Sequence, residues 1–224
     1  MANADRQPGL GTGIYTYPEA AKLLGVSSAK VRRWADGYVC ALNGRERQKK
    51  PVLQRRTCLP GLLTFCDLIE LFFVREFRDA GVPLQDIRDA AWLLADRWDT
   101  PYPFAFRRLE TDGRQILLQA GEQYENVARR QQVFGFAAEF FKNIDFDREL
   151  AERWWPLGRE KLIVIDRHRS FGAPIDCRSG VRTEVIFATY KAEQDTKAVA
   201  EWYEIRTEAV IAAVEFEERW SRAA

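Results

Sequence analysis

The sequence predicts a mainly α-helical fold with small β elements. It would comprise an N-terminal winged helix-turn-helix, an α+β middle region and a C-terminal trihelical, helix-turn-helix-like domain. Two short helix patterns flank Gly25, apolar residues recur at the helical period across residues 64–98, and three helix patterns close the chain. The expected parts are a disordered leader at 1–13, a winged domain at 14–98, a connecting region at 99–160 and the trihelical domain at 161–224.

The first helix carries both a start signal and a stop signal. Thr16 can cap it, Pro18 fits its first turn, and Glu19 stands where a capping box requires a carboxylate. Ala20, Ala21, Leu23 and Leu24 should face inward, and Gly25 suits the left-handed turn that ends a helix. These signals predict a helix over residues 18–24.

A second, basic helix should follow from residue 28 to about residue 36, capped by Ser27. Val31, Trp34 and Ala35 fall on one face, at the spacing that packs against the first helix. The polar residues then remain free for the major groove of DNA: Ser27, Ser28, Lys30, Arg32 and Arg33.

Residues 38–57 are predicted to form a β-hairpin wing, in which short apolar ends flank a polar tip containing Gly44 and Pro51. Basic wings grip phosphates and give salt-dependent affinity that is blind to sequence. The candidate wing contacts are Tyr38, Arg45, Arg47, Lys49, Lys50, Arg55 and Arg56. A disordered charged loop is the alternative interpretation of this stretch.

Two longer helices should complete the winged domain. Thr64 and Asp67 provide a second capping pattern, followed by apolar residues at helical spacing up to Phe77. Gly81-Val82-Pro83 ends this helix, and residues 84–98 form the next, with Ile87, Ala91, Leu94 and Ala95 inward.

The middle region is less regular. Residues 104–109 and 115–118 flank Asp112-Gly113 and are predicted to pair as a hairpin, while residues 133–141 fit either helix or strand. The aromatic pairs Phe140-Phe141 and Trp154-Trp155 could line a ligand pocket, but an ordinary core is favoured.

The tail should be compact. Residues 161–166 are predicted to form a strand, residues 169–180 a loop, and residues 183–192 a helix. Asp195 caps a further helix, and residues 208–220 form the last one. The expected core of this unit comprises Ala198, Val199, Trp202, Ile205, Val210, Ile211, Val214 and Phe216. The acidic face of the last helix indicates a protein-interaction or dimer module rather than a DNA-binding one, with a merely solvated face as the alternative; its residues are Glu204, Glu208, Glu215, Glu217 and Glu218.

Charge is unevenly distributed along the chain. Residues 1–60 hold eleven Lys and Arg against four Asp and Glu, whereas residues 61–160 hold thirteen against eighteen. A basic head on an acidic body indicates that a polyanion binds at one end.

Several classes of function receive no support. The four cysteines contain no CxxC pair and His168 is the only histidine, so neither a zinc site nor histidine-based catalysis is expected. No phosphate-binding glycine loop, catalytic constellation or cofactor motif is found. No apolar run reaches the length of a membrane helix, and we expect a cytoplasmic protein.

Two stretches resemble known families. YTYPEAAKLLGVSSAKVRRW, with the later LTFCDLIELFFVREFRDAGVPLQDIR, resembles the winged helix of MerR-type regulators. Residues 163–219 resemble the trihelical domain of unknown function numbered 433, although Gly172-Ala173-Pro174 stands where that family usually has Gly-Arg-Pro. Their order on one chain is similar to that of the long VapB-type antitoxins.

This resemblance implies an antitoxin of a type II toxin–antitoxin system. It would bind double-stranded operator DNA as a homodimer and neutralise a PIN-domain ribonuclease toxin within a hetero-oligomeric complex. Candidate toxin contacts in the tail are Arg167, Arg169, Arg178, Arg182, Trp202, Tyr203, Phe216 and Trp220. The alternatives are a stand-alone MerR-like regulator that senses an apolar ligand, and a scaffold that binds protein through its tail.

Overall fold

The computed structural model describes residues 13–42, 45–54, 61–109 and 140–221. The head contains β1 (Ile14–Thr16), α1 (Tyr17–Leu24), α2 (Ser28–Asp36), β2 (Tyr38–Leu42), β3 (Arg45–Lys49), β4 (Leu62–Thr64), α3 (Phe65–Asp79) and α4 (Leu84–Trp98). The remainder contains β5 (Ile144–Asp147), β6 (Leu150–Trp154), η3 (Arg159–Lys161), β7 (Ile163–Asp166), η4 (Ser170–Gly172), β8 (Pro174–Asp176), α7 (Thr183–Glu193), α8 (Thr196–Trp202) and α9 (Thr207–Ser221).

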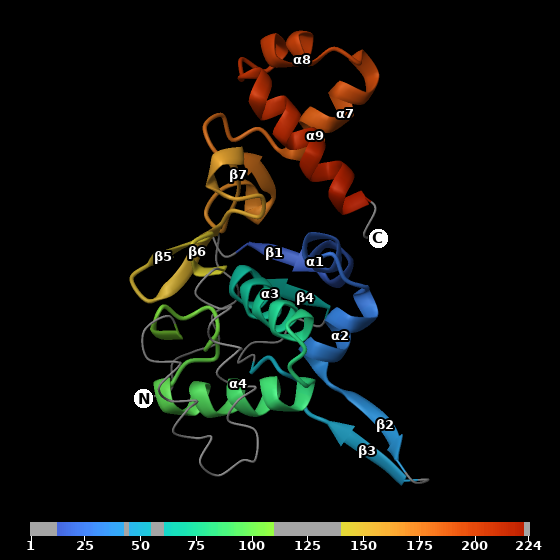
Figure 1. Ribbon diagram of the computed structural model, residues 1–224, viewed down its shortest axis with the longest axis vertical. Helices are drawn as coiled ribbons and strands as arrows, with labels where there is room; N and C mark the ends of the chain where they lie inside the picture. The colour runs from blue at the N-terminus through green and yellow to red at the C-terminus, as the bar shows by residue number, and fades with distance from the viewer. Residues whose placement is uncertain (1–12, 43–44, 55–60, 110–139, 222–224) are drawn as a thin grey trace.

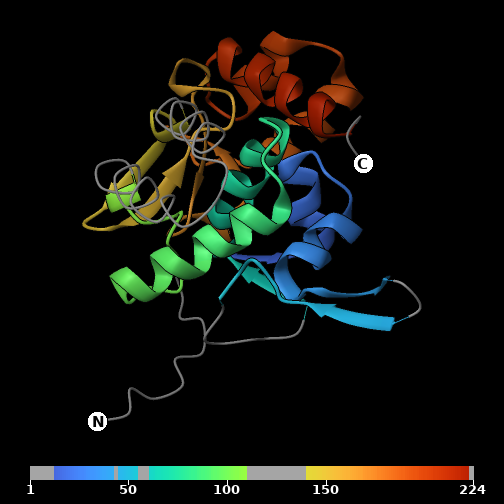
Figure 2. The same cartoon turned by 60° about the horizontal axis from the view of Figure 1, so that its bottom comes forward.

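The head is the predicted winged helix-turn-helix. Thr16 with Glu19 and Thr64 with Asp67 form complete capping boxes, so both predicted helix starts are confirmed. β1 pairs antiparallel with β4, which places α1 and α3 side by side. The hairpin β2–β3 extends away from the body in both views (Figures 1 and 2). Strand β2 ends at Leu42 and β3 runs from Arg45 to Lys49, so Pro51 follows the hairpin rather than forming part of its tip.

Helix α3 is the centre of the core and is buried along most of its length. The ring centroids of Phe72 and Trp154 lie 5.0 Å apart, and those of Phe73 and Phe141 lie 5.1 Å apart. Phe141 and Trp154 fill the core against α3, as the favoured interpretation of the middle region expected, whereas Trp155 is only partly buried and lies against Arg159. Aromatic pairs at such centroid distances stabilise a core beyond the area that they bury.

A four-stranded antiparallel sheet in the order β5-β6-β7-β8 joins the middle region to the tail. Because β6 pairs with β7, this sheet spans the expected boundary at residue 160. Strand β8 lies within residues 169–180, which were predicted to be a loop. That prediction was wrong, because a strand of only three residues is defined by its partner β7 rather than by its own pattern.

The predicted hairpin at 104–118 is also corrected where the structure describes it. None of residues 104–109 belongs to a strand: Phe106 forms one isolated bridge with Leu150, and Arg108 and Leu109 are helical. Residues 115–118 and 133–139 lie outside the described residues, whereas Phe140 and Phe141 are helical. The conformation of residues 104–109 therefore depends on tertiary contact with β6.

The trihelical tail is present, but two of its expected core residues are on the surface. Trp202 is 72% exposed and Ile211 is 53% exposed. The buried stripe of α9 contains Ala209, Ala213 and Phe216, and at 100° per residue Ile211 falls on the opposite face. Apolar character alone therefore misplaced both residues.

The tail docks onto the head. Figure 1 shows the end of α9 beside α1. The indole nitrogen of Trp220 donates to the carbonyl oxygen of Leu23 at 2.6 Å. Gly13, assigned to the leader by the sequence, is buried near Phe65 and Tyr15. In the part of the chain that is described, no helix is long and apolar enough to cross a membrane.

Candidate nucleic-acid interface

The turn between α1 and α2 sets the direction of α2. Gly25 adopts a left-handed conformation (φ 63°) and its amide bonds to the last turn of α1. The hydroxyl of Ser27 accepts a hydrogen bond from the amide of Lys30, so Ser27 caps α2 as predicted. Val31, Trp34 and Ala35 are buried, which fixes the rotation of α2 about its own axis.

The outer face of α2 is polar and exposed, at the predicted positions Ser28, Lys30, Arg32 and Arg33. The first turn of α2 contains no acidic side chain. Arg32 lies 5.9 Å from the ring centroid of Tyr17, whose hydroxyl donates to Asp36. None of the three cations on this face is buried, so all three are accessible to a polyanion.

Gly37 is the single residue between the end of α2 and the start of the hairpin at Tyr38. Gly37 has φ 79°, and a Cβ atom at this position would overlap the carbonyl oxygen of Lys49. Only glycine therefore allows the two strands to close directly against the end of α2. This contact fixes where the hairpin starts relative to the exposed face of α2.

The cross-strand register places basic residues of β3 on one face of the hairpin. Tyr38 pairs with Lys49, and Cys40 pairs with Arg47. Because directly opposed residues share one face of a sheet, these four residues belong to the same face of the hairpin. The backbone of Arg45 pairs with Leu42, but its side chain lies outside what the structure describes, as do Arg55 and Arg56.

An aromatic contact joins the helix to the hairpin. The guanidinium of Arg33 lies 4.1 Å from the ring centroid of Tyr38, the first residue of β2. A guanidinium over an aromatic face is held by the ring quadrupole while its hydrogen-bond donors stay free for a ligand. Arg33 is therefore oriented before any ligand binds, and α2 and the hairpin form one continuous basic surface.

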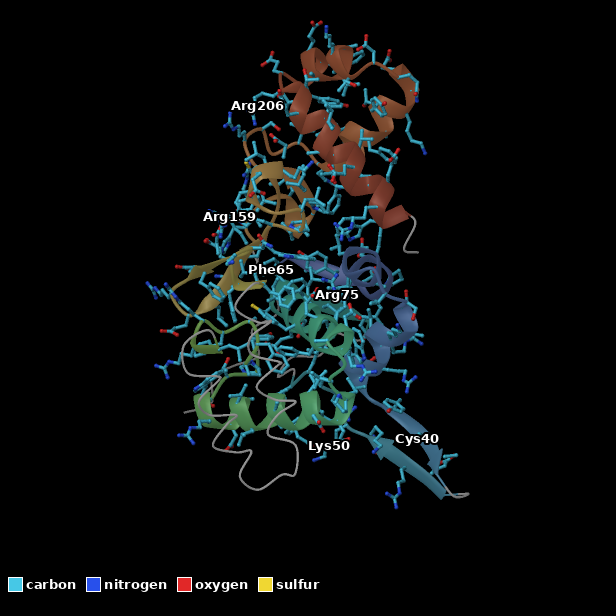
Figure 3. All side chains as sticks on the ribbon, in the orientation of Figure 1. Cys40, Lys50, Phe65, Arg75, Arg159 and Arg206 are labelled. Carbon is cyan, nitrogen blue, oxygen red and sulfur yellow. The ribbon has the colours of Figure 1, made fainter. Side chains whose placement is uncertain are left out.

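Lys50, the last described cation of the predicted wing, is exposed but lies against α4. Its ammonium lies 5.0 Å from the ring centroid of Trp92, and its carbonyl oxygen accepts a hydrogen bond from Arg88 at 2.6 Å. Figure 3 labels Lys50 where the hairpin meets α4.

Sequence reasoning missed a basic cleft of about 380 Å³ beside α2. Lys30 and Arg33 line it from α2, and Arg75 and Arg78 line it from the last turns of α3, with Asp79 as the acidic member. Arg75 also donates to the carbonyl oxygen of Leu24 at 3.0 Å, and burial lowers its pKa to about 10. The spacing of Arg75 and Arg78, one helical turn apart, is the signal in the sequence that could have revealed it.

The candidate toxin contacts are dispersed over the tail. Arg178 and Trp202 are exposed, and Arg182 is exposed but pairs with Glu184 at 2.5 Å. Arg167 is mostly buried, near Asp147, whereas Arg169 donates to the carbonyl oxygen of Cys177. The structure does not gather these residues into one cluster of free cations.

The aromatic candidates in the tail differ in accessibility. Tyr203 is half-buried and its hydroxyl lies 2.7 Å from that of Thr189. Phe216 and Trp220 are 1% and 5% exposed and stack on each other, with centroids 4.3 Å apart. These two rings belong to the core, so a partner cannot reach them in this conformation.

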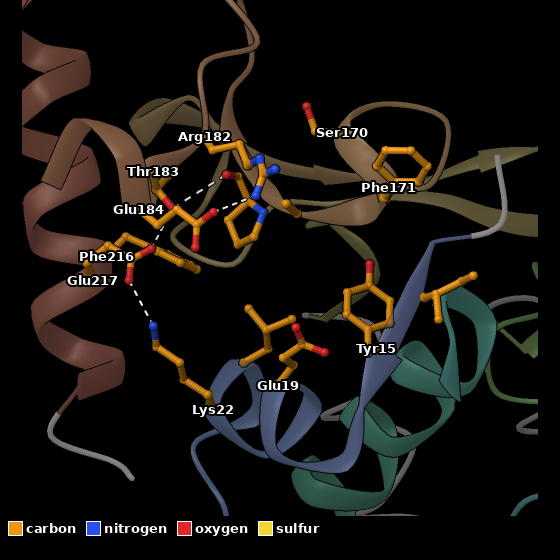
Figure 4. Close-up of a pocket in the computed structure, with 14 residues that line it drawn as sticks. Tyr15, Glu19, Lys22, Ser170, Phe171, Arg182, Thr183, Glu184, Phe216 and Glu217 are labelled. Atoms are coloured by element: carbon orange, nitrogen blue, oxygen red, sulfur yellow. Dashed lines mark hydrogen bonds and ion pairs between the residues drawn. The ribbon is translucent and has the colours of Figure 1, made fainter. Parts of the chain in front are cut away.

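A second cleft, of about 240 Å³, separates α1 from the tail (Figure 4). The carboxylate of Glu217 accepts from the ammonium of Lys22 at 3.0 Å and from the hydroxyl of Thr183 at 2.6 Å. Glu217 is therefore buried at the junction of head and tail, although the sequence placed it on an exposed acidic face. Phe171, 70% exposed, lies at this cleft.

Comparisons with known proteins agree with this architecture. Residues 13–91 match the family model described as "Putative DNA-binding HTH domain". The chain is 31% identical to a Mycobacterium tuberculosis (strain ATCC 25618 / H37Rv) protein named "Putative antitoxin VapB45". That match covers 85% of this chain and 87% of that protein. A crystal structure of Rv2018 from Mycobacterium tuberculosis superposes with a TM-score of 0.73 at 26% identity, covering 89% of this chain and 96% of that one. The chain therefore belongs to the family of VapB45.

Proposed function

We propose that this chain is the antitoxin of a type II toxin–antitoxin pair, which binds operator DNA through its head and a toxin through its tail. The observation that carries the proposal is the continuous basic surface from α2 to the hairpin, joined by the contact between Arg33 and Tyr38. The kinship with VapB45 supports the antitoxin role. We infer that the chain acts by binding rather than by catalysis.

In this proposal α2 enters the major groove, where Lys30, Arg32 and Arg33 reach base edges or adjacent phosphates. The hairpin lies along the phosphate backbone and contacts it through Arg47 and Lys49, with Arg45, Arg55 and Arg56 as further proposed contacts. Each phosphate that the chain neutralises should contribute about 0.9 to the slope of log affinity against log salt. The expected assembly on an inverted repeat is a homodimer.

The test is a gel shift with a DNA duplex taken from the region upstream of the chain's own reading frame. Arg32→Ala/Arg33→Ala should abolish the sequence-specific complex, whereas Arg47→Ala/Lys49→Ala should weaken binding to all sequences and lower the salt slope by about two. The matched control is Arg178→Ala/Arg206→Ala, which removes two exposed cations from the tail. Wild-type affinity in both head variants would contradict the proposed DNA contacts.

For the toxin, we propose a PIN-domain ribonuclease that the tail covers. The exposed Arg178 and Trp202 are the tail positions most accessible to it. We further propose that the head is a winged helix of the MerR type and that residues 161–224 form the domain numbered 433. The proposal requires a PIN-domain ribonuclease in a neighbouring reading frame, and co-expression of the two chains should yield a stable complex that lacks nuclease activity. A ribonuclease that stays active in the presence of excess antitoxin would contradict this part.

A further inference from the structure

The segment that leaves the hairpin, residues 50–54, lies between α2 and α4. The amide of Val52 donates to the carbonyl oxygen of Trp34 in α2 at 2.8 Å. On the other side, the side-chain amide of Gln54 donates to the carbonyl oxygen of Ala91 in α4 at 3.0 Å. Val52 and Leu53 are buried in the core. The exit of the hairpin is thus held by two helices, only one of which belongs to the helix-turn-helix.

Arg88 of α4 makes the shortest of these contacts. Its Nε donates to the carbonyl oxygen of Lys50 at 2.6 Å, and one terminal nitrogen donates to the side-chain oxygen of Gln85 at 2.8 Å. The residue is only 4% exposed, and its other terminal nitrogen is buried without a hydrogen-bond partner. Among the described residues no carboxylate forms an ion pair with it.

A buried guanidinium without a counter-ion is costly, so stability does not explain its presence. A neutral apolar residue of similar size would pack there at lower cost. What the guanidinium supplies is a forked donor that fixes the main chain of Lys50 at a defined angle to α4. Its position under a basic hairpin also adds positive potential where a polyanion would dock.

Trp92 lies one turn further along α4 and contacts the same segment at the surface of the molecule. Its indole nitrogen donates to the carbonyl oxygen of Pro51 at 3.3 Å while its ring lies under the ammonium of Lys50. Arg88 and Trp92 therefore bind consecutive carbonyl oxygens at the point where β3 ends. A two-stranded hairpin is marginally stable alone, so its direction depends on how its ends are held.

We propose that Arg88 and Trp92 are positioning residues that set the angle of the β2–β3 hairpin to α2, and thereby the phosphates that Arg47 and Lys49 reach. This inference rests on the proposed DNA binding and assigns α4 a role in it. One end of the hairpin is fixed at Gly37 and the other at Lys50. Without the Arg88 and Trp92 contacts, the exit of the hairpin would be held only further along, by Val52 on Trp34 and Gln54 on Ala91, and the basic face could shift.

The test is a double-mutant cycle in the full chain. DNA affinity is measured on the upstream duplex and on a random-sequence duplex, with Arg88→Gln and Trp92→Leu each made in the wild type and in Arg47→Ala/Lys49→Ala. In the wild type Arg88→Gln should weaken binding on the order of tenfold, the loss expected when a buried hydrogen-bond donor is removed. Trp92→Leu should weaken binding by less, because its contact is exposed, and both changes should lower the salt slope. In the hairpin-neutralised background neither should weaken binding further, because no hairpin contact remains to be lost.

Arg88→Lys keeps the positive charge but loses the forked pair of donors. It should lower the salt slope as Arg88→Gln does, which tests whether charge alone can position the hairpin. Val199→Ala, a buried change in the tail, controls for lost stability and should leave DNA affinity unchanged. The positioning role is refuted if the Arg88 and Trp92 variants bind DNA like the wild type, or if their losses add fully to those of Arg47→Ala/Lys49→Ala. Either result would leave the proposed DNA binding intact. If Arg47→Ala/Lys49→Ala itself has no effect, the proposed hairpin contacts fail as well.

Discussion

The hydroxyl of Tyr15 donates a hydrogen bond to the carbonyl oxygen of Gly172 at 2.8 Å, across 157 positions of sequence. Tyr15 is in β1, beside the helix-turn-helix, and Gly172 is in the turn between β7 and β8 of the tail. Burial raises the pKa of the Tyr15 hydroxyl above its ordinary value, which favours the protonated form that donates this hydrogen bond. Head and tail are thus joined by a specific polar contact in addition to their shared core.

Gly172→Ala should lower the free energy of unfolding by about 2 kcal/mol or more, because φ is 80° and the new Cβ would overlap the hydroxyl of Tyr15. Urea denaturation measures the change. Gly81→Ala is the control, since Gly81 has φ 85° but a Cβ there would meet no atom within 4 Å, and it should cost only the backbone strain. Equal losses in the two variants would show that the contact with Tyr15 is not tight.

Trp220→Phe should destabilise the docking of α9 on α1 by about 1–3 kcal/mol. The ring stacked on Phe216 is largely kept, but the carbonyl oxygen of Leu23 loses its donor. That oxygen lies in the last turn of α1, where carbonyls have no partner within the helix. The same substitution at exposed Trp202 should change the thermal midpoint little, and a comparable loss there would refute the role given to the Trp220 indole.

Glu70→Gln should remove a pH dependence of stability. Burial, the dominant cause, raises the pKa of the Glu70 carboxyl well above its usual value, although the amides of Phe104 and Ala105 donate to it. Because the folded chain then holds this proton more tightly than the unfolded chain, the free energy of unfolding falls as pH rises above the ordinary glutamate range, about 4.3.

The glutamine can still accept both amide bonds without ionising, so Glu70→Gln should be the more stable protein under alkaline conditions. Urea denaturation of both proteins from about pH 5 to about pH 9 measures the difference. Glu193→Gln, an exposed change in α7, should leave the slope of the wild type intact. Parallel curves for the wild type and Glu70→Gln would mean that Glu70 is ionised in the folded chain.

Trp202→Ala should weaken toxin binding by about tenfold or more without lowering stability, since a large exposed ring contributes to an interface and not to the core. Calorimetric titration with the proposed ribonuclease, beside a thermal melt of the free chain, separates the two effects. Leu93→Ala removes an exposed apolar side chain from the head and should leave toxin affinity unchanged. Wild-type toxin affinity in Trp202→Ala would exclude the surface around Trp202 from the toxin interface.

The head was largely predictable because its signals are local. Thr16 with Glu19 and Ser27 with Lys30 act within a few residues, so their geometry depends little on the rest of the chain. The α2 face was predictable for the same reason, since the helical period alone separates Val31 from Lys30 and Arg33. Strand β8 and the surface position of Trp202 depend on distant neighbours, and local patterns missed both.

By itself, the sequence determined the helix-turn-helix, its basic face and the hairpin that follows it, because caps, turns and periodicity act over one or two turns of chain. Only the tertiary structure decided that Trp220 reaches Leu23, that Glu217 is buried between Lys22 and Thr183, and that Arg88 holds Lys50. Each of those contacts joins residues more than thirty positions apart. Packing of the whole core, and not the pattern of any one segment, brings them within hydrogen-bonding distance.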